Sequence, residues 1–280
     1  MGEPCPTYTE TEHILEVNMG EHQSDIKIID EYGQESGHIP ARHRAIYLLP
    51  NAFTTAALFA GFFAIVKAMS HEFDIAAVAI FCAMVLDGMD GRVARLTNTQ
   101  SAFGEQYDSL ADMVSFGVAP ALVVFMWQLQ GLGTGRVGLI VAFVYCACAA
   151  LRLARFNINT DVIDKRYFQG LPSPSAAALM AGMVWLVSEK DLPISEQALP
   201  YIAIAMTLFA GLSMITNVRY WSGKAIGIQH SVPFFKLLIF VAVMLCIISW
   251  PAFTLFGLAF GYALSGYVQW AIQAVRLKKS

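Results

Sequence analysis

Eight long apolar stretches dominate the sequence and restrict what the chain can fold into. They lie at residues 45–68, 75–96, 106–127, 137–156, 175–187, 199–215, 234–250 and 252–275. All but the short fifth approach the roughly 20 residues that a helix needs to cross a bilayer. Charged residues make up only 14% of the chain, against roughly 25% in soluble domains. The sequence therefore predicts an all-α membrane protein with about eight transmembrane helices.

The basic residues predict the orientation of these helices. With the N-terminus in the cytoplasm, fifteen of the 18 Lys and Arg residues fall on the cytoplasmic side, leaving only Lys67, Arg136 and Lys190 outside. Cytoplasmic loops carry the excess of basic residues, so both termini are expected in the cytoplasm. We expect a polar cytosolic tail at 1–44, a transmembrane domain at 45–275 and a basic cytosolic C-terminus at 276–280. With no secretory signal peptide expected, the bacterial inner membrane is the predicted location.

Charge and cysteine usage argue against two kinds of site. The net charge is -3, and no basic patch is interleaved with aromatic residues, so we expect no nucleic-acid partner. Four of the five cysteines lie in apolar stretches, and no pair has the spacing of a zinc site. The cysteines are therefore interpreted as small packing residues.

Four aspartates interrupt the second and third apolar stretches. One charge near the centre of a bilayer costs about 3 kcal/mol. Asp87 and Asp90 are three residues apart, and Asp108 and Asp112 are four apart, so each pair shares one helix face. A short loop at about 98–103 makes the two helices antiparallel neighbours. The sequence therefore predicts that the four carboxylates converge on one site.

Such a cluster is expected to bind divalent cations. Oxygen ligands without His or Cys suit Mg²⁺ or Mn²⁺ better than zinc. Two ions fit four carboxylates better than one, because a bridging carboxylate can serve both. Gly88 and Gly91 lie in the same stretch. Glycines there indicate either close helix packing or room for a ligand, and beside the aspartates we favour ligand room at Gly91.

Residues 87–112 spell D-x-x-D-G-x-x-A-R-(x)8-G-x-x-x-D-x-x-x-D. This pattern resembles the signature of the CDP-alcohol phosphotransferases at all eight fixed positions. The resemblance implies a catalytic transmembrane bundle and a homodimer. It also implies that Asp87 and Asp108 bridge two metal ions, that Asp90 binds the first, and that Asp112 binds the second and acts as general base.

The same resemblance implies a site for the nucleotide. Gly91 and Arg95 would contact the CDP group, as would Ser101, six residues after the arginine. Asn51 and Thr54 match the Asn-x-x-Thr that touches the nucleotide diphosphate in this family.

Two further strings indicate the acceptor. RLARFN at 152–157 and FQGLPSPSAA at 168–177 resemble the branch of this family in bacterial membranes whose acceptor is L-serine. The implied reaction transfers the phosphatidyl group from CDP-diacylglycerol to the serine hydroxyl, with release of CMP.

The carboxylate of serine needs a cation, for which an Arg fork is suited. The candidates on the expected side are Arg152, Arg155, Arg166 and Arg219. Each could equally be a membrane anchor, and either of the first two could serve the lipid phosphate instead. Ser173 could contact a substrate or cap the next helix.

Other functions remain open alternatives. A choline acceptor would need an aromatic cage, and glycerol phosphate or inositol phosphate would need a denser basic pocket. A divalent-cation transporter also carries aspartates in the membrane, but transporters tend to show matching broken helices in two halves. A non-catalytic lipid-binding scaffold would have no need of Asp112.

Overall fold

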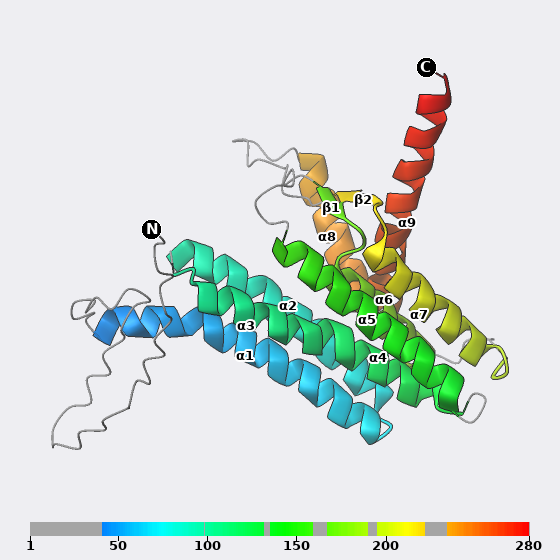
Figure 1. The fold of residues 1–280 in the computed structure, drawn as a ribbon, viewed down its shortest axis with the longest axis horizontal. Helices are drawn as coiled ribbons and strands as arrows, with labels where there is room; N and C mark the ends of the chain where they lie inside the picture. The colour runs from blue at the N-terminus through cyan, green and yellow to red at the C-terminus, as the bar shows by residue number, and fades with distance from the viewer. Residues whose placement is uncertain are drawn as a thin grey trace, which may run out of the picture. The chain divides into compact units, whose positions relative to one another are not determined.

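The computed structural model describes residues 41–97, 99–131, 135–158, 167–189, 195–221 and 234–279. Eight helical segments cover most of these residues, in the order shown in Figure 1. Seven are plain α-helices: α1 Ala41–Met69, α2 Phe73–Thr97, α5 Arg136–Ile158, α6 Ser173–Glu189, α7 Leu199–Ile215, α8 Phe234–Ser249 and α9 Pro251–Lys279. They coincide with predicted apolar stretches, so the all-helical fold class is confirmed.

The remaining segment, at 102–129, changes its helical type along its length. It consists of α3 Ala102–Asp112, the π-helix η1 Met113–Val118, α4 Ala119–Val124 and the π-helix η2 Phe125–Leu129. The first π-helical segment begins directly after Asp112. Single-turn π segments inside α-helices are often found at functional sites.

Helix boundaries follow local sequence signals. Pro251 begins α9 two residues after α8 ends, which suits a residue that lacks a backbone N–H donor. Ser101 caps α3 by accepting a hydrogen bond from the Gly104 backbone N–H at 3.0 Å. α1 starts at Ala41, four residues before the predicted start. The rest of the predicted tail, 1–40, lies outside the described residues.

Four described segments are long and apolar enough to cross a membrane: Leu49–Met69, Ala102–Leu129, Arg136–Ile158 and Pro251–Ile272. Leu199–Ile215 and Leu237–Ser249 are shorter apolar helices. α2 carries two aspartates and two arginines in its second half. The structure therefore has the character of an integral membrane bundle, while the full set of eight spans stays a prediction.

α6 is at the centre of this bundle. It packs against α2, α7 and α9 and is buried along most of its length. Small residues permit the close approach that helix packing in membranes requires. A Cβ at Gly182 would lie 3.0 Å from the Phe256 Cα of α9, and one at Gly211 of α7 would lie 3.2 Å from the Tyr145 Cα of α5.

A short antiparallel ladder, which the sequence did not predict, joins two interhelical loops. It pairs β1 Tyr167–Gln169 with β2 Arg219–Trp221. The fully buried Tyr220 fastens the ladder to α9, because its hydroxyl donates to the Ala263 carbonyl at 3.0 Å. Gly266 of α9 leaves space for the Tyr220 ring, which any Cβ at that position would overlap.

Gly170, directly after β1, has a φ of +77°, and a Cβ there would also overlap the Met214 carbonyl oxygen. The left-handed conformation alone costs a non-glycine residue roughly 1–2 kcal/mol. We therefore expect Gly170→Ala to lower the apparent melting temperature of the detergent-purified protein by several degrees. Gly131→Ala is the control, since a Cβ at Gly131 meets nothing within 4 Å. Equal melting temperatures for the two variants would contradict this account of the turn.

Candidate active site

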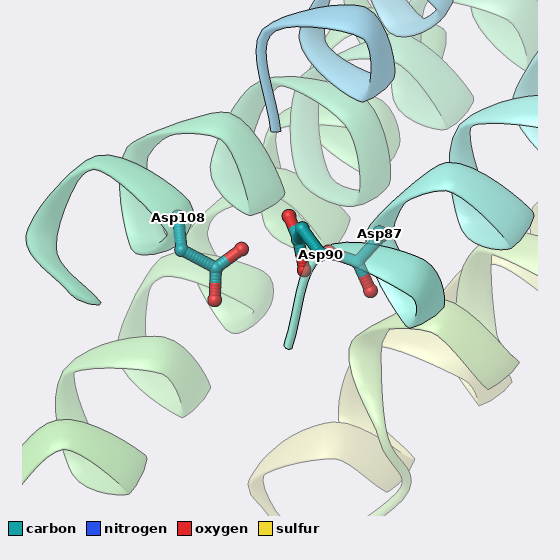
Figure 2. A group of neighbouring side chains, drawn as sticks. All are labelled: Asp87, Asp90 and Asp108. Carbon is teal, nitrogen blue, oxygen red and sulfur yellow. The ribbon is translucent and has the colours of Figure 1, made fainter. Parts of the chain in front are cut away.

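Three of the four predicted aspartates meet in one cluster. Asp87 and Asp90 come from α2 and Asp108 comes from α3, and one carboxylate oxygen of each lies within 4.8 Å of the others. Figure 2 shows Asp108 reaching from its helix toward Asp90 and Asp87 on the neighbouring helix. The predicted convergence is therefore present for these three side chains.

Asp112 adjoins the cluster but does not belong to the group of three. Its carboxyl group lies close enough to those of Asp87 and Asp108 to interact with them electrostatically. The Oδ1 atoms of Asp108 and Asp112 are buried and have no hydrogen-bond partner among the described residues. Unpaired buried carboxylate oxygens are costly, and a hard divalent cation is the ligand that suits an all-oxygen donor set. The residues therefore fit one or more such ions.

Thr54 of α1 orients Asp90. Both side chains are almost fully buried, at 4% and 5% exposure, and the Thr54 hydroxyl lies 2.7 Å from Asp90 Oδ2. The other Asp90 oxygen accepts the backbone N–H of Gly91. The Thr54 hydroxyl also lies 3.2 Å from the Pro50 carbonyl oxygen, but its shorter contact is with Asp90, so the threonine supports the acid cluster.

A cavity of about 600 Å³ opens beside the cluster, between α1, α2 and the start of α3. Its lining includes both Asp90 and Asp108. It also contains every residue predicted to contact the nucleotide: Asn51, Thr54, Gly91, Arg95 and Ser101. The structure therefore brings these predicted residues together beside the acids.

Gly91 faces open space in this cavity. A Cβ at Gly91 would meet only Arg95 Nη1, at 3.9 Å, and a Cβ at Gly88 would meet nothing within 4 Å. Close helix packing therefore does not explain either glycine, and the geometry favours ligand room at Gly91. The Ser101 hydroxyl accepts the Gly104 backbone N–H as the cap of α3, and its own proton remains available to donate into the cavity.

The two candidate arginines of α5 have different surroundings. Arg152 Nη1 donates a hydrogen bond to the hydroxyl of Ser173, which is fully buried at the start of α6. Its Nε is buried without a hydrogen-bond partner among the described residues, and Asp112 and the neutral Tyr262 side chain lie near its guanidinium. Arg155 instead binds two amide side chains. The two arginines were predicted to share a helix face, and their side chains nevertheless bind different partners.

Sequence reasoning missed Gln169, Asn217 and Tyr262. Gln169 and Asn217 accept the hydrogen bonds of Arg155, and Tyr262 interacts electrostatically with Arg152. Gln169 lies within the FQGLPSPSAA string, which was a usable signal. Asn217 lies two residues before the candidate Arg219, whereas Tyr262 lies far from every motif in the sequence. Arg219 lies in β2, and Arg166 is outside the described residues.

The chain matches the family model described as CDP-alcohol phosphatidyltransferase over residues 47–209. It is 35% identical over 233 residues to the CDP-diacylglycerol–serine O-phosphatidyltransferase of Helicobacter pylori. The alignment covers 83% of this chain and 94% of that protein. A relative of the same name in Methanocaldococcus jannaschii is 33% identical over 191 residues, or 68% of this chain and 82% of that protein. A third relative of this name, from Saccharomyces cerevisiae, is 41% identical over 182 residues. That alignment covers 57% of this chain and 64% of that protein.

The chain therefore belongs to the CDP-alcohol phosphatidyltransferase family, as its motif predicted. The matched region spans the four aspartates, both α5 arginines and Ser173. This membership agrees with the apolar helices in identifying an integral membrane protein.

The contact between Thr54 and Asp90 leads to a prediction about metal use. Thr54→Val keeps the shape of the side chain but removes its hydrogen bond to a proposed metal ligand. Loss of such a supporting contact typically weakens metal affinity by roughly 10- to 100-fold. We expect the Mg²⁺ or Mn²⁺ concentration for half-maximal activity to rise by that factor, and Thr54→Ser to restore it. Thr207→Val is the control, because the equally buried Thr207 hydroxyl donates to the Ala203 carbonyl within α7. An unchanged metal requirement in Thr54→Val would contradict the role.

The open space at Gly91 leads to a second prediction. Gly91→Ala adds a methyl group to the cavity wall without touching another helix, and Ala is favoured over Gly in a helix by up to about 1 kcal/mol. We therefore expect unchanged or higher thermal stability with a roughly 10- to 100-fold lower kcat/KM for the nucleotide-linked lipid. Gly88→Ala makes the same helical change outside the cavity lining. Equal activity in both variants would remove Gly91 from the ligand site.

Proposed function

We propose that this chain transfers the phosphatidyl group of CDP-diacylglycerol to the hydroxyl of L-serine and releases CMP. The observation that carries the proposal is the acid cluster of Asp87, Asp90 and Asp108, within 4.8 Å of one another and with Asp112 next to it. It adjoins the cavity lined by the predicted nucleotide residues. The relatives named for this reaction support the choice of serine.

The proposed metal ligands are the four aspartates. Asp87 and Asp108 would serve both of two ions, Asp90 one and Asp112 the other, and the unpaired Oδ1 atoms of Asp108 and Asp112 support this assignment. Bound Mg²⁺ or Mn²⁺ would neutralise the pyrophosphate and stabilise the leaving CMP. Asp112 is the proposed general base, because the attacking hydroxyl must lose its proton to a nearby carboxylate.

The cavity beside Gly91 is the proposed site of the CDP group. Arg95 lies in its wall and offers a guanidinium fork to phosphate oxygens. Asn51 contributes an amide, and Ser101 contributes the hydroxyl proton that the helix cap leaves free. Thr54 supports this region through Asp90.

Arg152 is the proposed anchor for the serine carboxylate. Its Nη1 is held by Ser173, while its buried Nε has no partner and Nη2 donates to no described residue. The Nε–Nη2 edge is one of the two edges through which a guanidinium binds a carboxylate with two parallel bonds. Its electrostatic interaction with Asp112 would bring the acceptor close to the proposed base.

The lipid chains have a separate proposed site. An apolar cavity of about 560 Å³ lies between α2, α6, α8 and α9, with Met84, Ala178 and Leu258 in its lining. Tyr262 lines this cavity as well and interacts with Arg152. Tyr262 thus lies near both the apolar cavity and Arg152, which suits a lipid whose acyl chains lie in the cavity.

The membrane arrangement is part of the same proposal. Eight spans with both termini and the active site on the cytoplasmic side agree with the distribution of Lys and Arg. A homodimer in a bacterial inner membrane is also proposed, on the basis of the family resemblance.

The function is tested with protein purified in detergent, CDP-diacylglycerol and a divalent ion. CMP release is measured with L-serine, choline, glycerol 3-phosphate or inositol phosphate as acceptor. We expect release that depends on L-serine and stops when the ion is chelated. Release with a different acceptor alone would reject serine, and release with none of them would reject the transferase proposal for this chain.

The proposed base gives a direct prediction. Asp112→Asn keeps the side-chain volume but cannot accept the proton, and general base catalysis contributes roughly 10²- to 10⁴-fold. We expect kcat to fall by roughly 10²-fold or more, while the gel-filtration profile and the melting temperature stay close to those of the wild type. Asp74→Asn, at the exposed far end of α2, is the matched control. Turnover at the wild-type rate in Asp112→Asn would exclude Asp112 as the base.

A further inference from the structure

Two amide side chains hold the guanidinium of Arg155. Its Nη2 donates hydrogen bonds to Gln169 Oε1 at 2.8 Å and to Asn217 Oδ1 at 2.6 Å. Gln169 ends β1, between α5 and α6, whereas Asn217 follows α7. Two loops that are far apart in the sequence thus meet on one side chain of α5.

The backbone around both amides is itself fixed. Gln169 lies opposite Arg219 in the ladder. The next two residues are tied as well, because the Gly170 N–H donates to the Val218 carbonyl at 2.8 Å and the Leu171 N–H donates to Ser213 at 2.9 Å. The buried Tyr220 fastens β2 to α9. These bonds give the two amides a defined position even though their side chains reach solvent.

Neutral oxygens hold the charged guanidinium of Arg155 in the described part of the chain. Both oxygens that accept its hydrogen bonds are uncharged, and within the described part of the chain no carboxylate forms an ion pair with it. A carboxylate would make a hydrogen bond roughly twice as strong as a neutral oxygen does. A contact needed only to fasten the end of α5 would therefore be better made by Asp or Glu.

Arg155 lies close to the proposed acceptor site. Residues three apart on a helix are neighbours, with about 5–6 Å between their Cβ atoms, and Arg152 is three residues before Arg155. Arg152 in turn interacts with Asp112. A full positive charge at Arg155 therefore adds to the positive potential around Arg152, against the negative charge of the acids.

We propose that Gln169 and Asn217 are positioning residues that hold Arg155 beside Arg152 with its charge intact, so that the arginine pair attracts and seats an acceptor carboxylate. This inference rests on the proposed function, in which the acceptor is an amino acid. It separates two roles: Arg152 offers the guanidinium edge that has no hydrogen-bond partner, and Arg155 supplies a fixed positive charge next to it.

The test replaces each amide by the acid of the same shape. Asn217→Asp and Gln169→Glu keep or strengthen the hydrogen bond to Arg155 but neutralise its charge. We expect the KM for L-serine to rise roughly tenfold in each variant, with little change in kcat or in the KM for CDP-diacylglycerol. The wild-type KM for serine should also rise with ionic strength, and this salt dependence should weaken in both variants. Melting temperatures should stay at or above the wild-type value.

Gln197→Glu is the matched control, because Gln197 is exposed just before α7, at the opposite end of the helix that Asn217 follows. If the contact serves only to fasten α5, the acid variants will match wild type in serine KM and in salt dependence, and the inference is wrong. If Asn217→Asp does not fold, Gln169→Glu decides the question alone. A wild-type protein with no serine-dependent CMP release would instead overturn the proposed function, and is recognised before any variant is compared.

Discussion

The repulsion among four carboxylates within an apolar helical bundle is the constraint on which the rest of this structure depends. One carboxylate oxygen of each of Asp87, Asp90 and Asp108 lies within 4.8 Å of the others, and Asp112 lies close enough to repel them. Such an arrangement is unfavourable unless protons or cations compensate for the charge. Thr54 and the Gly91 N–H supply hydrogen bonds to Asp90, but two oxygens of the other acids stay without a partner. The oxygens of the cluster therefore fit divalent cations, the ligands that suit an all-oxygen donor set.

The nucleotide, the lipid chains and the acceptor are each assigned to different helices around the acids. The cavity toward α1 contains Asn51, Gly91 and Arg95, which suits a nucleotide diphosphate. The apolar cavity toward α8 and α9 suits hydrocarbon chains. The arginines of α5 lie on a third side, with Ser173 at the start of the central helix α6. Nucleotide, lipid and acceptor can thus approach the acids from different helices.

Most of the fold and the acid cluster could be predicted, because each rests on a strong local signal. Helix lengths follow from the thickness of the bilayer. Helical periodicity places Asp87 with Asp90, and Asp108 with Asp112, on one face of their helices. The β1–β2 ladder could not be predicted, since two three-residue strands 50 residues apart carry no periodic pattern. The π-helical segment after Asp112 likewise has no composition signal. The separate contacts of Arg152 and Arg155 depend on Ser173, Gln169 and Asn217, whose positions are set by tertiary packing.

The most direct test of the central claim is electron paramagnetic resonance of Mn²⁺ bound to the purified protein. The account predicts two Mn²⁺ ions per chain with the spin coupling of ions that share ligands, and loss of this coupling in Asp87→Asn and in Asp108→Asn. Asp74→Asn should leave the spectrum unchanged. A protein that binds no Mn²⁺, or whose signal is the same after either cluster aspartate is replaced, would contradict the claim that these carboxylates form one metal site.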